Sequence, residues 1–425
     1  MEADAFHRLM KVLVDSGQSP TVDDAISTFS SYGVVIALGS SVRGSIAQQV
    51  IALTAINVAA RSFIGNVHVI GCPDIVLDAP GFEGQRLSDF CTWAGVTHSE
   101  SDIAAAWPVV MIGDNMADPE CGRAIRPWAC GWRFGLGGDN AGACESLFPP
   151  ACVAAGALAI SEAFSLLRRD NPYAGHRSVA FSLWSMTPAG DDGPAAPTMT
   201  SAGAWLIGLG HLGQAYAWTL GFMAPQDAPE LLLQDVDVIT QLTLSTSVLS
   251  SQSDVGKLKT RAVARWLEQR GFRTRLIERR FDATTRVSAE DPAIGLFGVD
   301  NAAARRCCES AGFRFIVDAG LGDGYRDFRA LRVRTFPGAV AASRLWTHDP
   351  VGHVNLAAPA YQALLTGGQG LCGVTTLLTR AVGAPFVGCY AAALVVAELM
   401  RREHGVQPHE VLSVNLRIPT DMECA

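Results

Sequence analysis

The chain has 425 residues, 49% hydrophobic and 17% charged, which is typical of a globular protein long enough for two or three domains. Its net charge of -8 and its short, isolated basic pairs exclude the positive surface that nucleic-acid binding requires. No uninterrupted apolar run reaches the roughly 18 residues of a membrane span, and the N-terminus is acidic where a secretory signal is basic. We therefore expect a cytoplasmic protein that binds neither nucleic acid nor membrane.

The first half begins with a β-α-β pattern. An apolar strand is predicted at 33–38, a Gly/Ser turn from Gly39 to Gly44, an Ala-rich helix at about 45–63 and a second strand at 67–71. The turn lacks the G-x-G-x-x-G spacing, and the second strand leads into GCPDIVLD instead of ending directly in an acidic residue. This half is predicted to fold but to be poorly equipped to hold a nucleotide.

A linker is predicted at 187–202, where TPAGDDGPAAPTMTSA has neither a helical nor a strand period. It divides the chain into 1–186 and 203–425. Each part begins with a β-α-β pattern and ends with a Pro-led helix rich in small residues, at 149–170 and 385–404. We interpret this as an internal duplication, which gives an α/β protein with two Rossmann-like halves. The alternative is two α/β units that are similar only in their general composition.

The second half opens with a glycine motif directly after a short apolar strand. Gly208, Gly210 and Gly213 have the G-x-G-x-x-G spacing, which places phosphate groups at a helix N-terminus. The next apolar strand, ELLLQD, ends at Asp235, where a carboxylate accepts hydrogen bonds from ribose hydroxyls. These features alone fit an NAD- or FAD-dependent oxidoreductase equally well.

Three further motifs follow the glycines in a fixed order. They are D-x-D at Asp235 and Asp237, G-x-x-K at Gly256 and Lys259, and D-N-x-x-x-R at Asp300, Asn301 and Arg305. The succession over about 200–400 resembles the adenylation domain of the ThiF and ubiquitin-activating-enzyme superfamily. It also resembles the activating enzymes of bacterial ubiquitin-like conjugation operons of the antiphage Bil type. The second half is thus identified as the active adenylation domain and the first half as a degenerate one.

The resemblance implies ATP- and Mg²⁺-dependent activation of the C-terminal carboxylate of a ubiquitin-like protein. Lys259 would stabilise charge on the phosphates during attack, and Asp300 would hold Mg²⁺, which prefers oxygen ligands. Lys257 is an alternative phosphate ligand whose spacing fits less well. The implied nucleotide-binding residues are Gly208, Gly210, Gly213, Asp235, Asp237, Thr243, Thr246, Lys259, Asn301 and Arg305.

One part of the superfamily pattern is missing. Where relatives have an S-N-L-N-R-Q stretch that contacts ATP, this chain has LTLSTS, which places Thr243 and Thr246 at those positions. Hydroxyl groups do not supply the positive charge of the lost arginine. We expect another arginine to replace it, and Arg8, in an expected N-terminal helix, and Arg43, in the first turn, are the candidates.

Cys372 is the candidate thioester acceptor. It lies within a glycine-rich segment at about 362–380, just before a predicted helix, where the helix N-terminus favours a thiolate. Its position is similar to that of the cysteine that precedes the last helices of bacterial relatives with ubiquitin-like partners. The resemblance implies transfer of the acyl group from Cys372 to a conjugating enzyme. If Cys372 is structural, the alternative is an adenylating enzyme for a sulfur carrier or small molecule, or a scaffold that only binds its partner.

The other sulfur and imidazole groups are expected to have minor roles. The eleven cysteines include no C-x-x-C pair, so zinc is not expected, although Cys121 and Cys130 leave a scattered site open. The remaining thiols are predicted to be mostly reduced and buried. His211 is interpreted as a packing residue, and His348 and His353 as residues that could line a partner surface. The C-terminal tail is predicted to hold one strand at most, and a homodimer stays open.

Overall fold

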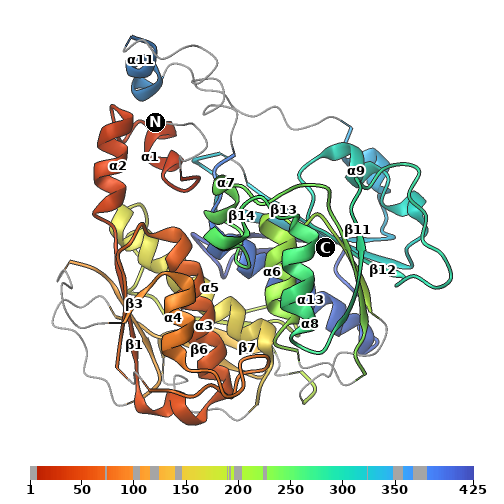
Figure 1. The fold of residues 1–425 in the computed structure, drawn as a ribbon, viewed down its shortest axis with the longest axis horizontal. Coiled ribbons are helices and arrows are strands. Elements are labelled where there is room, and N and C mark those ends of the chain that lie inside the picture. Colours follow the sequence, from red (N-terminus) through yellow and green to blue (C-terminus); the bar gives the residue numbers. More distant parts are fainter. Residues whose placement is uncertain are drawn as a thin grey trace.

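The computed structural model describes residues 7–71, 74–98, 106–114, 124–138, 146–188, 190, 193–195, 203–223, 227–322, 324–347, 358–366 and 381–425. Two α/β units lie side by side, with helices packed between their sheets (Figure 1). Four residues that the sequence singles out, Cys121, His348, His353 and Cys372, lie outside the described residues.

The first half is built on a five-stranded sheet of order β3-β2-β1-β4-β5. Every neighbouring pair of strands runs parallel. β1, in the middle, is buried along its whole length, as is usual for a parallel strand covered on both faces. The strands are β1 (Val34–Leu38), β2 (Val67–Ile70), β3 (Thr97–His98), β4 (Val109–Ile112) and β5 (Ala124–Ile125).

The second half is built on an eight-stranded sheet of order β11-β10-β9-β12-β13-β14-β15-β16. The strands from β11 to β13 run parallel, and the strands from β13 to β16 pair in antiparallel fashion. The sheet consists of β9 (Ala204–Ile207), β10 (Glu230–Gln234), β11 (Arg273–Ile277), β12 (Ile294–Phe297), β13 (Phe315–Leu321), β14 (Ala330–Phe336), β15 (Val411–Asn415) and β16 (Met422–Cys424).

The two halves have the same strand order. In each, the first strand lies in the middle of the parallel part, with its next two strands on one side and the following two on the other. In the chain order of each half, a long helix also comes between two strands that pair in antiparallel fashion. In the first half, α5 (Pro149–Arg168) comes between β7 (Arg133–Leu136) and β8 (Val179–Ser182). In the second half, α13 (Pro385–Glu403) comes between β14 and β15. β6 (Pro127–Cys130), β7 (Arg133–Leu136) and β8 (Val179–Ser182) form a separate antiparallel sheet. The long helices at the ends of the two halves are confirmed.

Four helices join the halves into one core. α3 (Ile46–Ser62) packs on α5, α6 (His211–Leu220) packs on α13, and α5 packs on α13. Small side chains allow this close packing: a Cβ at Gly156 of α5 would lie 2.8 Å from the carbonyl oxygen of Ile51 in α3. Buried side chains from both halves consequently form one continuous hydrophobic cluster, and a second cluster lies within the second half.

α5 is the one described helix that is long and apolar enough to cross a membrane, and 89% of its apolar window is buried inside the protein. Its apolar sequence is interrupted by Ser161 and Glu162, so the uninterrupted run stays shorter than a membrane span. The apolar surface of α5 packs against α3 and α13, which accounts for its composition.

Three local features differ from the expectations. Arg8 lies in a turn before α1 (Lys11–Asp15) and not within a helix. The tail holds two strands, β15 and β16, because β16 pairs back onto β15. The indole of Trp132 donates a 3.0 Å hydrogen bond to the carbonyl of Pro194, so this described part of the 187–202 segment packs against the first half.

The remaining helices are short or lie at the edges of the two units. They are α2 (Val22–Ser30), α4 (Leu87–Ala94), α7 (Gln241–Leu244), α8 (Lys259–Glu268), α9 (Ala302–Arg306), α10 (Ala342–Leu345) and α11 (Pro359–Thr366), with 3-10 turns at Ser40–Gly44, Gln252–Asp254 and Glu309–Ala311. Six of the described cysteines are free thiols, and Cys130 is disulfide-bonded. Burial raises the pKa of the thiols of Cys152 and Cys389 to about 12, as expected for inert core residues.

Candidate functional site

The predicted site residues gather at the point where the strand order of the second sheet reverses. The chain runs from β9 outward to β10 and β11, and then returns to β12 on the other side of β9. Ligands of open α/β sheets bind at such a switch point, outside the carboxyl ends of the strands. Gly208 directly follows β9 there, and Gly298 directly follows β12. The carbonyl of Ile207 accepts a 2.8 Å hydrogen bond from the amide of Gly298.

The three glycines of the turn after β9 have different backbone conformations and different amounts of space around them. Gly208 has a φ of +80°, which favours glycine, and a Cβ at Gly213 would lie 1.9 Å from the carbonyl oxygen of Gly208. At Gly210, by contrast, a Cβ would meet no described atom within 4 Å. Gly210 is the N-cap of α6, and no described side chain caps it. Among the described residues, the start of α6 thus has open space beside Gly210, and a helix N-terminus with such space can receive an anion.

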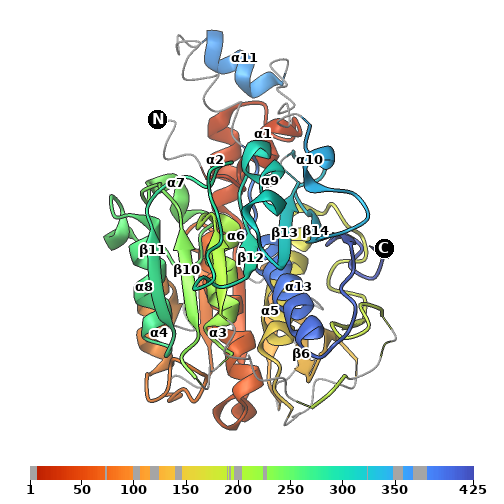
Figure 2. The same ribbon diagram turned by 90° about the vertical axis from the view of Figure 1, so that its right-hand side faces the viewer.

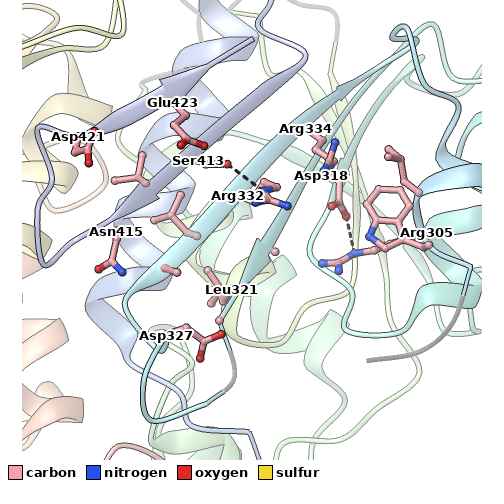
Figure 3. A pocket seen from close by; sticks show the side chains of 17 residues that line it. Arg305, Asp318, Leu321, Asp327, Arg332, Arg334, Ser413, Asn415, Asp421 and Glu423 are labelled. Atoms are coloured by element: carbon pink, nitrogen blue, oxygen red, sulfur yellow. Dashed lines mark hydrogen bonds and ion pairs between the residues drawn. The ribbon is translucent and has the colours of Figure 1, made fainter. Parts of the chain in front are cut away.

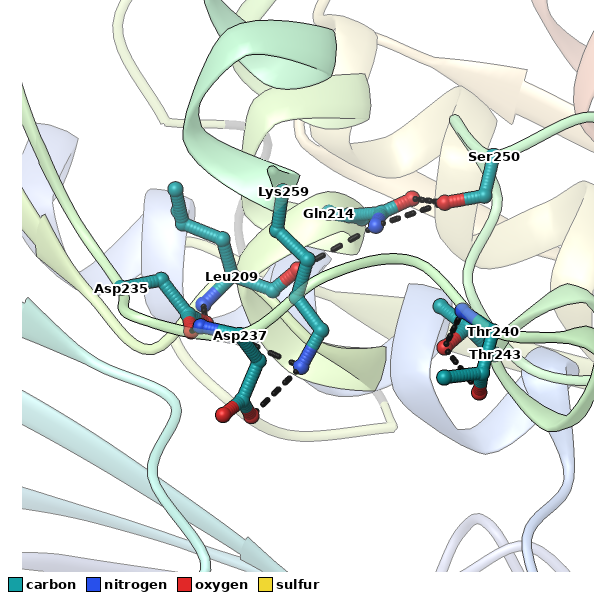
Figure 4. A network of polar contacts seen from close by, with 8 residues as sticks. All are labelled: Leu209, Gln214, Asp235, Asp237, Thr240, Thr243, Ser250 and Lys259. Carbon is teal, nitrogen blue, oxygen red and sulfur yellow. Dashed lines mark hydrogen bonds and ion pairs between the residues drawn. The ribbon is translucent and has the colours of Figure 1, made fainter. Parts of the chain in front are cut away.

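Asp235 ties this turn to the end of β10. Its two carboxylate oxygens accept hydrogen bonds from the amides of Leu209 at 2.6 Å and Asp237 at 2.8 Å (Figure 4). Each oxygen keeps a second lone pair for another donor. The acidic residue that the sequence places at a ribose therefore also fixes the glycine turn.

Lys259 brings a positive charge to the same place. As the first residue of α8, it directs its ammonium to Asp237 at 2.9 Å and to Asp235 at 4.0 Å (Figure 4). The Lys259 side chain is 12% exposed, whereas that of Asp237 is 58% exposed. Lys257 instead pairs with Asp254 at 3.0 Å. The G-x-x-K lysine is therefore the one that lies beside the D-x-D motif.

The D-N-x-x-x-R residues follow β12 but have different partners. Asp300 is exposed, and the side chain of Asn301 caps α9 by accepting a 2.8 Å hydrogen bond from the amide of Ala304. Arg305 donates to the carboxylate of Asp318 at 2.9 Å and to the carbonyl of Ala319 at 2.8 Å. Burial raises the pKa of Asp318, and Arg305 opposes that rise. Arg305 is thus held against β13.

Asp300 stands without a preformed metal site around it. Across the described ranges, no group of three or more His, Cys, Asp or Glu side chains is arranged to hold a metal ion. A single exposed carboxylate fits Mg²⁺, which is commonly bound by one or two carboxylates together with substrate phosphates and water. Asp300 therefore fits the metal only together with a bound phosphate.

The two threonines in place of the missing arginine have structural partners. The hydroxyl of Thr243 accepts a 3.0 Å hydrogen bond from the amide of Thr240, which closes the cap of α7 (Figure 4). Thr246 is 2% exposed. A Cβ at Gly383 would lie 2.8 Å from the Thr246 methyl group.

Arg8 lies next to this region, whereas Arg43 does not. A Cβ at Gly383 would lie 3.3 Å from Cδ of Arg8. Burial, together with the charge of Arg8, lowers the pKa of His211 to about 3. Since His211 is the first residue of α6, Arg8 lies near the open N-terminus of that helix. Arg43 precedes the 17-residue helix α3, whose opposite end faces the second half, about 25 Å away.

The chain approaches the Cys372 segment through α11. Figure 2 shows α11 above α1 and α2, and the hydroxyl of Tyr361 donates a 2.6 Å hydrogen bond to Asp15 of α1. Cys372 itself lies outside the described residues.

A groove of about 590 Å³ lies over the antiparallel part of the second sheet. Arg332 and Arg334 point to its face of β14 because they alternate with the buried Leu331 and Val333. Figure 3 shows Arg332 between the Arg305–Asp318 pair on one side and Glu423 and Asp421 on the other. The acidic lining residues are Asp318, Asp327, Asp421 and Glu423.

Sequence reasoning missed Arg61, Asn57 and Gln214. Arg61 and Asn57 of α3 donate to backbone carbonyls of the loop after α7 in the other half. Gln214 of α6 links that loop to the glycine turn. The available signal was the polar pair Asn57 and Arg61 at positions i and i+4 of a helix rich in Ala, Ile and Val, where a buried polar group requires a partner.

Two family models and one curated relative match this chain. Family models for the BilD N-terminal and C-terminal domains match residues 33–183 and 201–406. The chain is 38% identical over 440 residues to the bacterial E1-like protein BilD of Collimonas sp. (strain OK412), covering 98% of this chain and 92% of that protein.

Solved structures of Escherichia coli MccB are similar at a lower level. MccB with MccA-N7isoASN is 19% identical, with a TM-score of 0.38, and the match covers 52% of this chain and 64% of that chain. MccB alone is 17% identical, with a TM-score of 0.37, and the match covers 52% of this chain and 61% of that chain. The chain thus spans less than two thirds of the length of MccB.

Proposed function

Because the chain belongs to the BilD family of E1-like proteins, we propose that it activates the C-terminal carboxylate of a ubiquitin-like protein with ATP and Mg²⁺. The observation that carries the proposal is the grouping at the switch point of the second sheet. There Lys259 and two carboxylates lie beside a helix N-terminus that faces open space. A cation and free amides suit a triphosphate, and the D-x-D carboxylates suit ribose hydroxyls.

In the first step a carboxylate oxygen of the partner attacks the α-phosphorus of ATP, and pyrophosphate leaves. The N-terminal amides of α6 and the ammonium of Lys259 stabilise the negative charge that builds up on the phosphates. Asp300 would hold Mg²⁺, which would supply positive charge to the phosphates. Lys259 would leave its ion pair with Asp237 to reach the nucleotide, and the carboxylate of Asp237, which is 58% exposed, would then be solvated by water.

Arg8 is our candidate for the positive charge that the LTLSTS stretch lacks. Its side chain passes Gly383 and lies close enough to the start of α6 to depress the pKa of His211. Asn301 and Arg305 act less directly in this account, since one caps α9 and the other is bound to β13.

The groove over β13 to β16 is our candidate for the partner's C-terminal tail. Arg305 belongs both to the D-N-x-x-x-R motif and to the groove lining, so the groove begins next to the adenylation site. An extended, polar tail fits its open, charged floor, which Arg332 of β14 and Glu423 of β16 line from the two sides of β15.

In the second step the thiolate of Cys372 attacks the acyl carbon of the adenylate, and AMP leaves. The resulting thioester then passes to the thiol of a conjugating enzyme. The glycine-rich sequence around Cys372 and its similarity to activating enzymes of antiphage operons support this step. The adenylate alone would be the product if Cys372 had no such role.

The first half, 1–186, is proposed to be a degenerate duplicate of the active half, 203–425, with 187–202 as the connection. The shared strand order supports a duplication. In the first half, Asp114 follows β4 and accepts a 2.9 Å hydrogen bond from the amide of Ser41 in the glycine turn. A carboxylate of the protein thus occupies donors that a phosphate would otherwise use.

A gel assay tests the thioester step. The protein is incubated with MgATP and the ubiquitin-like protein encoded nearby, and we expect a thiol-labile adduct on non-reducing gels. Cys372→Ala should abolish the adduct, while Cys424→Ala, at an exposed free cysteine, should retain it. An adduct that persists in Cys372→Ala, or AMP release without any adduct in the wild type, contradicts the acceptor role.

A further inference from the structure

Arg61 of the first half is buried against the second half. It is 8% exposed and lies in the last turn of α3. Its guanidinium donates to the carbonyls of Ser247 at 3.0 Å and Ser250 at 2.9 Å, and it also contacts the backbone and side-chain oxygens of Asn57. These four oxygen partners are neutral, and burial lowers the pKa of Arg61 to about 10.

Asn57, one turn earlier on α3, holds the same loop. Its side-chain amide donates a 3.0 Å hydrogen bond to the carbonyl of Val248. Three carbonyls within residues 247–250 of the second half are therefore bound by two side chains of the first half. A single carboxylate would neutralise Arg61 without fixing any backbone, whereas separate carbonyls must all stand in place at once.

The loop in turn contacts the glycine turn through Gln214. The Gln214 side chain accepts a 2.9 Å hydrogen bond from the amide of Leu249 and donates at 2.9 Å to the hydroxyl of Ser250. It also donates at 3.2 Å to the carbonyl of Leu209, between Gly208 and Gly210 (Figure 4). All of these groups are buried, so the contacts are not replaced by solvent at low cost.

We propose that Arg61 and Asn57 are positioning residues through which the first half sets the geometry of the nucleotide turn in the second half. The chain of contacts runs from Arg61 to the 247–250 loop, then to Gln214, and ends at Leu209. The inference rests on the proposed function only in that the turn binds ATP. It gives the degenerate half a role that needs no nucleotide of its own.

A binding experiment separates positioning from simple stabilisation. Fluorescent mant-ATP with Mg²⁺ is titrated into the full chain, and thermal unfolding is recorded in parallel. We expect Arg61→Gln to weaken binding about tenfold, the effect of losing hydrogen bonds from a charged group. Arg61→Lys should give an intermediate loss, because one ammonium reaches fewer of the carbonyls.

Arg329→Gln is the matched control. Arg329 is also a buried arginine between the halves, but it pairs with Asp170 at 3.1 Å. We expect this variant to lower the melting temperature and leave the mant-ATP Kd within twofold of the wild type. Asn57→Ala, a milder change, should weaken binding about threefold and serves if Arg61→Gln does not fold.

The outcomes distinguish this inference from the proposed function. Wild-type binding with unchanged affinity in Arg61→Gln or Asn57→Ala overturns the positioning role and leaves the proposed function standing. Equal losses of affinity in Arg61→Gln and Arg329→Gln also overturn it, because general stability would then explain the effect. A wild-type protein that binds no mant-ATP contradicts the proposed function itself.

Discussion

The turns after β1 and β9 occupy the same place in two sheets of the same strand order, yet their donors have different fates. In the turn after β9, Gly210 faces open space and no described side chain caps α6. In the turn after β1, the carboxylate of Asp114 accepts hydrogen bonds from the Ser41 amide at 2.9 Å and the Ser40 hydroxyl at 3.2 Å. Asp235 binds the Leu209 amide of the turn after β9, but no described side chain caps α6, so the start of that helix is the part that we propose receives an anion of the ligand.

The residues around each turn sharpen the difference. Hydrogen bonds from Ser41 hold the pKa of Asp114 below its ordinary value, so Asp114 stays ionised at neutral pH. β10 leads into Asp235 and Lys259 lies beside it, whereas β2 leads into Gly71, where a Cβ would lie 2.4 Å from the carbonyl of Leu38. The two halves thus share a topology, but only the turn after β9 has a carboxylate and a cation beside it, as the proposed nucleotide site requires.

Loss of Lys259 should break the comparison most strongly. We expect Lys259→Ala to slow partner-dependent exchange of pyrophosphate into ATP about 100-fold, because a fixed positive charge is lost where phosphate charge develops. Lys257→Ala is the matched control, since Lys257 pairs with Asp254. If both variants lose exchange equally, or if Lys259→Ala retains it, the assignment of Lys259 is wrong.

Substitutions of Arg8 and Arg43 test which arginine of the first half supplies positive charge to the proposed nucleotide site of the second half. Arg8→Ala should slow exchange about tenfold, as expected for a charge-assisted contact to phosphate. Arg43→Ala, at the far end of α3, should leave the rate unchanged. If Arg43→Ala slows exchange and Arg8→Ala does not, Arg8 is not the source of the positive charge.

The smallest expected effect compares one glycine in each turn. A Cβ at Gly210 or at Gly44 meets no described atom within 4 Å. Gly210→Ala should therefore leave the fold intact but weaken MgATP binding about threefold, because the methyl group projects into the space that receives the phosphates. Gly44→Ala should change neither MgATP binding nor the melting temperature. Titration calorimetry measures the MgATP affinity of both variants, and thermal unfolding measures their melting temperatures.

Much of this site was visible in the sequence because its residues follow strand ends in a fixed order. The glycine turn, Asp235 and Lys259 are brought together by the β-α-β pattern alone. The groove arginines were also within reach, since Arg332 and Arg334 alternate with Leu331 and Val333. That alternation was not interpreted as a charged face.

Other features depend on contacts that no local pattern encodes. Arg61 reaches Ser247 and Ser250 across the boundary between the halves, and Arg305 is drawn to Asp318 on a neighbouring strand. The paired tail strands, β15 and β16, likewise form only through pairing. Cys372 stays a prediction from sequence similarity.

The number of MgATP sites per chain tests the central claim most directly. Titration calorimetry of the wild type should give one site per chain, and Lys259→Ala should weaken that site while Asp114→Ala leaves the count at one. Two sites per chain, or a single site that is insensitive to Lys259→Ala, would contradict an account in which only the second half holds the nucleotide.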